Sequence, residues 1–79
     1  MRIDKYLKLS RIIKRRTIAQ EACDHERVTI NGKVAKPSSE VKVGDVLEIR
    51  FGSQTTKYEV LDIKEHVKKE ETNDLYRIL

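Results

Sequence analysis

The first apolar positions of the chain recur at the spacing of a helix. Ile3, Tyr6 and Leu7 fall on one side of such a helix, and Ser10 shares that side. The basic residues at positions 2, 5 and 8 fall on another side. The pattern therefore predicts a short amphipathic helix with a basic outer stripe at the start of the chain.

A second helix is predicted to follow residue 16. Thr17 and Gln20 have the spacing of a capping box, in which two side chains satisfy unpaired amides of the first helical turn. The side expected to be buried consists of Ile18, Ala19, Ala22 and Cys23. We interpret Cys23 as a small core residue, because no His or second Cys is spaced to activate its thiol.

A hairpin is predicted after the helices. Asn31-Gly32 separates the apolar runs 28–30 and 33–35, and this dipeptide tolerates the positive backbone dihedrals of a two-residue turn. Lys33 and Lys36 would bring positive charge to this hairpin. Lysines on an edge strand also protect against aggregation, so a structural reading of both residues stays open.

The remaining pattern predicts a small antiparallel sheet and a polar extension. Turn residues at 43–45 and 52–53 precede expected strands at 46–51 and 56–63. Residues 64–74 are almost all polar and predict a loose segment, whereas the apolar positions in 75–79 predict an end that docks on the domain or on a partner. The expected organisation is an α+β domain over residues 1–63, with two N-terminal helices on the sheet, and a C-terminal extension over residues 64–79.

The distribution of charged residues along the chain is uneven. Residues 1–36 carry ten Lys or Arg and four Asp or Glu, whereas residues 37–79 carry seven and nine. Between Arg2 and Arg16 there are seven basic side chains and one acid, Asp4. Such a density is costly unless a polyanion neutralises it, which predicts that this end faces nucleic acid. The separation of the two signs argues against charges that only solubilise a small domain.

The predicted connector between the helices holds much of this charge. Its basic residues are Arg11, Lys14, Arg15 and Arg16. They would cluster beside the positive N-terminal end of the second helix, where backbone amides add to the side-chain charge. The pattern predicts a site for phosphate oxygens, and the alternative is that these residues simply extend or cap the helices.

No motif marks a catalytic or metal site. His25 and His66 are isolated, and the sequence holds no metal-ligand spacing, no glycine-rich phosphate loop and no recognisable Ser, His and Asp set. We therefore expect no enzyme activity, cofactor or small-molecule substrate. A single cysteine cannot form an internal disulfide, and there is neither a signal peptide nor a long apolar run. A monomer in the reducing cytoplasm, with no membrane partner, is expected.

The order of four segments resembles the S4 RNA-binding domain. The segments are Ile3 to Leu7, Arg15 to Ala19, Val28 to Lys33 and Val43 to Leu47. The resemblance covers residues 1–51. The size and the basic start are also similar to the heat-shock protein 15 group, above all to its ribosome-associated quality control branch, and that likeness runs on through 68–71 and 75–76.

This resemblance implies two helices packed on a bent antiparallel sheet. It implies as partners the large-subunit rRNA, the peptidyl-tRNA of a stalled large ribosomal subunit, and a factor that adds a template-free tail to the nascent chain. The residues that it places at the RNA are Arg2, Asp4, Lys5, Arg11, Arg15 and Arg16, with Asn31, Gly32 and Lys33 shaping the hairpin. The chain departs from the family at Glu26, where glycine is common. A left-handed Glu26 would cost on the order of 1 kcal/mol.

The sequence is compatible with several functions. The leading hypothesis is a non-catalytic RNA-binding factor of ribosome-associated quality control, and heat-shock-type recycling of blocked large subunits would use the same surface. A lone accessory domain of an RNA-modifying enzyme is a second class, and a helix-turn-helix DNA-binding regulator is a third. Asp4 is expected to orient a neighbouring Arg, cap the first helix or accept a ribose hydroxyl.

Overall fold

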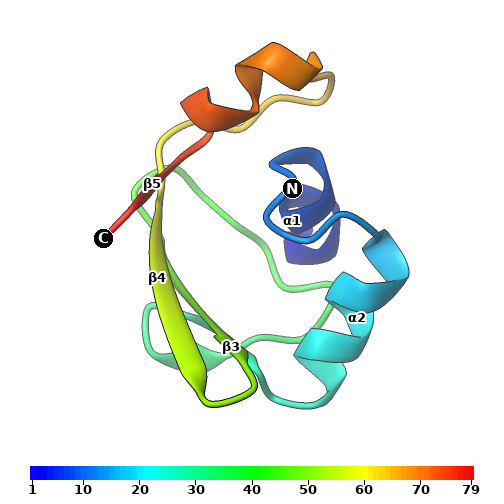
Figure 1. Cartoon of the computed structure of the whole chain (residues 1–79), viewed down its shortest axis with the longest axis vertical. Coiled ribbons are helices and arrows are strands. Elements are labelled where there is room, and N and C mark those ends of the chain that lie inside the picture. Colours follow the sequence, from blue (N-terminus) through cyan, green and yellow to red (C-terminus); the bar gives the residue numbers. More distant parts are fainter.

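The computed structural model of the 79-residue chain places two helices on one side of a five-stranded sheet (Figure 1). The helices come first, α1 over Ile3–Leu9 and α2 over Arg16–Asp24. The strands are β1 (Val28–Ile30), β2 (Lys33–Val34), β3 (Val46–Phe51), β4 (Gln54–Val60) and β5 (Tyr76–Ile78). Their order in the sheet is β2-β1-β3-β4-β5, and every neighbouring pair is antiparallel. The predicted α+β class is confirmed.

The core lies between the helices and the sheet. Ile3, Tyr6 and Leu7 are buried on the side of α1 that the helical spacing predicts. The sheet supplies Val28, Leu47, Ile49 and Val60. Each fully buried side chain of this size contributes about 1.5–3 kcal/mol relative to an exposed one. Packing against the sheet therefore fixes which side of α1 remains in solvent, and that side carries the basic stripe.

Helix α2 differs from its prediction in two respects. Ala19, Ala22 and Cys23 are buried, but Ile18 is 44 % exposed. A narrow buried stripe of small residues brings α2 close to α1 and leaves Ile18 on the flank, beside Phe51 at the end of β3. The predicted capping box is also wrong, because α2 begins at Arg16 without a side-chain cap.

The Asn31-Gly32 turn is confirmed. Both residues have positive φ, 51° and 84°, as a two-residue hairpin turn requires. The Asn31 side chain also ties the hairpin to the start of β3. Its Oδ1 accepts from the amide of Val46 at 2.9 Å, and its Nδ2 donates to Asp45 Oδ1 at 3.0 Å. The role expected for Asn31 in shaping the hairpin thus has a direct structural counterpart.

The C-terminal residues pack against the rest of the fold. Strand β4 ends at Val60, three residues before the predicted end, because the amides of Leu61 and Asp62 turn to donate to the carbonyl of Leu75. A 3-10 helix, η1 (Lys69–Asp74), occupies part of the segment predicted to be loose. Leu75 is fully buried, and β5 pairs with β4. The functional boundary after residue 63 stays a prediction.

Both α-helices are followed by a non-glycine residue in the left-handed region. Arg11 follows α1 with φ 61°, and Glu26 follows α2 with φ 58°. The conformation considered for Glu26 is therefore the one that it adopts, at a cost of about 1 kcal/mol relative to glycine. No helix of the chain is both long enough and apolar enough to span a membrane.

Candidate RNA-binding surface

The carboxylate of Asp4 is the centre of the N-terminal charge cluster. Arg2 contacts it with two nitrogens, Nε at 3.2 Å from Oδ1 and Nη2 at 3.1 Å from Oδ2. Arg16 Nε lies 3.3 Å from the same Oδ2, and Gln20 Nε2 donates to it at 3.0 Å. The backbone amide of Lys5 donates to Oδ1 at 2.8 Å. One acid on α1 thus holds side chains from α2 and from the residue before α1, together with a backbone amide of α1 itself.

The environment of Asp4 keeps its carboxylate ionised. Burial acts to raise its pKa, but the hydrogen bonds from Gln20, Arg16 and the amide of Lys5, together with the Arg16 charge, lower it below the ordinary value of 3.8. Gln20 Nε2 therefore donates to a charged carboxylate, and such a bond is stronger than one between neutral groups. Gln20 is thus held at Asp4, whereas a capping box would need its side-chain oxygen to accept from a backbone amide.

Two guanidinium groups share a single negative charge in this cluster. The Asp4 side chain is fully buried, whereas the side chains of Arg2 and Arg16 are 51 % and 44 % exposed. The cluster consequently keeps a net positive charge and presents outward N–H groups that suit forked contacts with phosphate. Of the roles expected for Asp4, the structure shows the orientation of neighbouring Arg side chains.

Lys5 has a partner from the far end of the chain. Its Nζ lies 2.6 Å from Glu65 Oε2, and both side chains are exposed. The hydrogen bond and charge of Lys5 lower the pKa of the Glu65 carboxyl. Exposed pairs of this kind contribute little to stability, so the contact can open when a stronger anion arrives. Lys5 thus lies on the basic side of α1, as expected, but it forms an ion pair with Glu65, which the sequence pattern did not indicate.

The connector residues Arg11 and Lys14 line a hollow of about 210 Å³. Lys8, Leu9 and Val67 complete its lining. Neither Arg11, Lys14 nor Lys8 forms an ion pair within the chain. Lys8 lies on the predicted basic stripe, but the sequence reasoning did not include it among the site residues. Its spacing of three from Arg11 was the available signal.

Arg15 occupies the position before the first turn of α2. It is exposed, makes no ion pair and adopts an extended backbone conformation. No side chain caps the amides of the first turn of α2. The N-terminal end of this helix therefore adds partial positive charge between Arg15 and Arg16.

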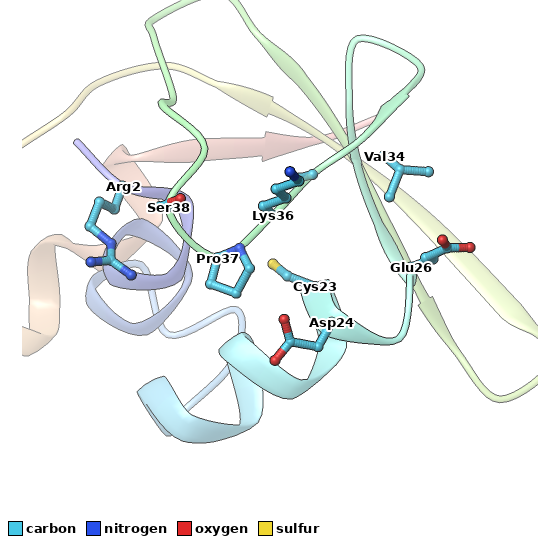
Figure 2. A pocket seen from close by; sticks show the side chains of 9 residues that line it. Arg2, Cys23, Asp24, Glu26, Val34, Lys36, Pro37 and Ser38 are labelled. Atoms are coloured by element: carbon cyan, nitrogen blue, oxygen red, sulfur yellow. The ribbon is translucent and has the colours of Figure 1, made fainter.

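The hairpin lysines face different hollows. Lys33 lines a hollow of about 430 Å³ together with Lys42, Glu40 and Asp45. Lys36 lines another of about 500 Å³, where Figure 2 shows Arg2 at one end and Glu26 at the other. Both hollows carry charges of the two signs. The structure thus gathers Arg2 and Arg16 at Asp4, places Lys8, Arg11 and Lys14 around a separate hollow, and leaves the hairpin lysines in mixed surroundings.

Cys23 is the one free cysteine of the chain, and it is buried. Burial, with the nearby charges of Asp4 and Asp24, raises the pKa of the Cys23 thiol to about 11. Cys23 borders the 500 Å³ hollow but is only 3 % exposed (Figure 2). No group of three or more His, Cys, Asp or Glu side chains is arranged to hold a metal ion.

Known proteins share both the sequence and the fold. The family model of the S4 domain matches residues 1–47. The RQC P-site tRNA stabilizing factor of Halalkalibacterium halodurans is 53 % identical over 78 residues, which cover 99 % of this chain and 89 % of that protein. The factor of the same name from Bacillus subtilis is 52 % identical and covers 100 % and 92 %.

A solved structure gives the same answer for the fold. The trimeric structure of heat shock protein 15 from Vibrio cholerae superposes with a TM-score of 0.90 at 30 % sequence identity, covering 100 % of this chain and 81 % of that chain. The matching residues 1–47 contain α1, α2, the connector and the hairpin, which carry the cations described above. On these grounds, the chain belongs to the S4 domain family and is a relative of the RQC P-site tRNA stabilizing factors.

Proposed function

We propose that the chain is a non-catalytic RNA-binding factor of ribosome-associated quality control. It binds rRNA and peptidyl-tRNA on the stalled large ribosomal subunit and supports template-free C-terminal tailing of the nascent chain. The names of its relatives support the process and the tRNA. The single observation that carries the proposal is the pair of half-exposed guanidiniums, Arg2 and Arg16, held by one buried carboxylate at Asp4.

The physical basis is recognition of backbone position and shape. Double-helical RNA hides its base edges in a deep and narrow groove, so a small protein reads phosphates and 2′-hydroxyl groups instead. Arg2 and Arg16 come from different elements but meet at Asp4, so their relative position is fixed before RNA binds. Preorganised cations of this kind lose less side-chain entropy on binding than free surface residues do. We infer that Lys5, Arg11, Lys14 and Arg15 extend the same surface.

The proposed function also specifies an oligomeric state, a cellular compartment and partners. The factor acts as a monomer on large subunits in the cytoplasm, with the tailing factor as a further partner and with no cofactor. Heat-shock-type recycling of blocked large subunits is the alternative that the likeness to heat shock protein 15 favours. A reconstituted tailing reaction separates the two roles, because a recycling factor would leave tail length unchanged.

The decisive experiment compares Arg16→Ala with Arg50→Ala in co-sedimentation with purified large subunits carrying peptidyl-tRNA. Both variants lose one exposed guanidinium, but Arg50 lies on β3, away from Asp4. We expect Arg16→Ala to lower subunit binding about tenfold or more while Arg50→Ala stays near the wild type. Equal binding by all three proteins would remove Arg16 from the interface.

A second measurement tests the class of nucleic acid. Binding to structured RNA and to duplex DNA of equal length is measured at several salt concentrations. Recognition of A-form shape predicts a preference for RNA that persists when salt weakens both complexes. Equal affinity at every salt concentration would instead favour the helix-turn-helix regulator.

A further inference from the structure

The hollow lined by Lys8, Leu9, Arg11, Lys14 and Val67, here called the cationic hollow, has an unusual composition. It contains three cations and no acid, whereas the hollows of the hairpin lysines contain both signs. Its walls come from both ends of the chain, since Val67 belongs to the C-terminal extension. Converging positive groups without a counter-charge of their own are arranged for an anion.

The backbone at Arg11 supports a use for its side chain. Arg11 adopts φ 61° two residues after the end of α1. Glycine would take this conformation without the steric cost that a Cβ atom adds. Strain of this kind is found where the surrounding structure holds a residue in place for a function. The conformation directs the chain from Lys8 round to Lys14, so that all three cations reach the cationic hollow.

The size and the walls of the cationic hollow narrow the choice of anion. Its volume of about 210 Å³ is below the roughly 300–1,000 Å³ typical of small-molecule sites. Leu9 and Val67 are both partly buried and add apolar surface beside the charges. A phosphate joined to a ribose and a base combines these two characters, whereas a free phosphate would leave the apolar wall unused.

We propose that the cationic hollow binds the phosphate of one unpaired ribonucleotide, with Leu9 and Val67 contacting its sugar or base. The inference rests on the proposed RNA-binding function and adds to it a discrete subsite. The residues that the subsite adds to the RNA-binding surface are Lys8, Leu9 and Val67. The C-terminal extension thereby takes part in RNA recognition rather than only in packing.

A matched pair of substitutions at Val67 tests the subsite. Val67→Glu and Val67→Lys remove the same partly buried side chain but place opposite charges at the wall of the cationic hollow. We expect the Glu variant to bind the dinucleotide UpU about tenfold more weakly than the Lys variant, in which the added cation offsets the loss of the apolar contact. Thermal unfolding of both variants checks that their folds are equally affected. Equal affinity for UpU in the two variants would overturn the proposal.

Nuclear magnetic resonance of the labelled full chain locates the probe. Saturable shifts at the amides of Lys8, Arg11 and Lys14 and at the methyl groups of Val67 on adding UpU support the subsite, provided that uridine, which lacks phosphate, gives none. Shifts confined to Arg2, Arg15 and Arg16 would contradict it. So would equal shifts on adding hexaglutamate, because that result identifies an acidic protein segment as the occupant.

The two proposals can fail separately. If the wild type co-sediments with large subunits but UpU misses the cationic hollow, only the subsite falls. If UpU binds in the cationic hollow while the wild type does not bind large subunits, the subsite stands and the proposed ribosomal function falls.

Discussion

The hydroxyl of Tyr6 donates a hydrogen bond of 2.6 Å to the backbone carbonyl of Leu75. Both residues are buried, and the amide of Leu61 donates to the same carbonyl at 2.9 Å. The first helix, the end of β4 and the start of β5 therefore meet at one oxygen atom. This contact anchors the C-terminal extension beside α1, where Glu65 and Val67 lie next to the basic stripe.

Tyr6→Phe tests how much the hydrogen bond between Tyr6 and Leu75 stabilises the fold. The change removes one hydrogen bond but leaves the Leu75 carbonyl with its two amide donors, so we expect a loss of about 1 kcal/mol in the free energy of unfolding. Urea denaturation measures the loss. Tyr76→Phe serves as the control, since its hydroxyl makes no hydrogen bond to another protein group. Equal losses in the two variants would show that the bond from Tyr6 to Leu75 adds nothing to the effect of removing a tyrosine hydroxyl.

Asp4→Asn tests the buried carboxylate. Its pKa in the folded protein is lower than the ordinary 3.8, so the folded state binds fewer protons there than the unfolded state does. The stabilisation is present above that value and is lost as pH falls through the folded pKa. We expect Asp4→Asn to cost about 1–3 kcal/mol at neutral pH, because hydrogen bonds to a charged group are lost.

The measurement is the melting temperature of the wild type and of Asp4→Asn at acidic pH. The difference in melting temperature between wild type and Asp4→Asn should shrink as pH falls from about 5 to about 2. Glu65→Gln is the control, because Glu65 also has a lowered pKa but lies exposed. A constant difference across this pH range would show that the Asp4 charge does not stabilise the fold.

Arg11 and Glu26 offer a paired test of strain against function. Each adopts a left-handed conformation after a helix, so glycine at either position should stabilise the fold by about 1 kcal/mol. Only Arg11 lines the cationic hollow. We expect both variants to melt at higher temperature in calorimetry, while Arg11→Gly alone loses affinity for UpU. Unchanged UpU binding by Arg11→Gly would leave its strain without a functional explanation.

The sequence predicted those parts of the fold that depend on local chemistry. The buried side of α1 follows from helical spacing, and the Asn31-Gly32 turn follows from the dihedrals that these two residues tolerate. Local pattern misassigned Gln20, because a capping-box spacing does not show that a buried acid 16 residues away binds the Gln20 side chain. The position of the Gln20 side chain is set by this tertiary contact and not by the local sequence.

The candidate site was predictable in its charge and less so in its arrangement. The clustering of basic residues is visible in the sequence, but the convergence of Arg2 and Arg16 on Asp4 requires the packing of α1 on α2. The contributions of Glu65 and Val67 could not be foreseen, since the segment around them is polar and irregular. Their positions depend on the pairing of β5 with β4, which is a contact between distant parts of the chain.

Cys23 is predicted to be chemically inert in the folded protein. Burial raises the pKa of its thiol from 9.0 to about 11, which lowers the thiolate fraction about 100-fold. We expect slow alkylation by iodoacetamide at pH 8 and fast alkylation in urea. Mass spectrometry follows the label, and Cys23→Ala provides the blank. Native labelling as fast as in urea would mean that the thiol is exposed by frequent opening.

Glu65→Gln addresses the ion pair with Lys5. Replacement of this exposed carboxylate leaves the ammonium of Lys5 unpaired and makes the chain more positive by one charge. We expect little change in melting temperature at neutral pH, as for other exposed pairs. Binding to large subunits should become tighter and more steeply dependent on salt, because Lys5 can then contribute to phosphate neutralisation.

Glu59→Gln, which removes an acid paired with Arg77 on β5, controls for net charge. Equal tightening by both variants would assign the effect to overall charge rather than to Lys5.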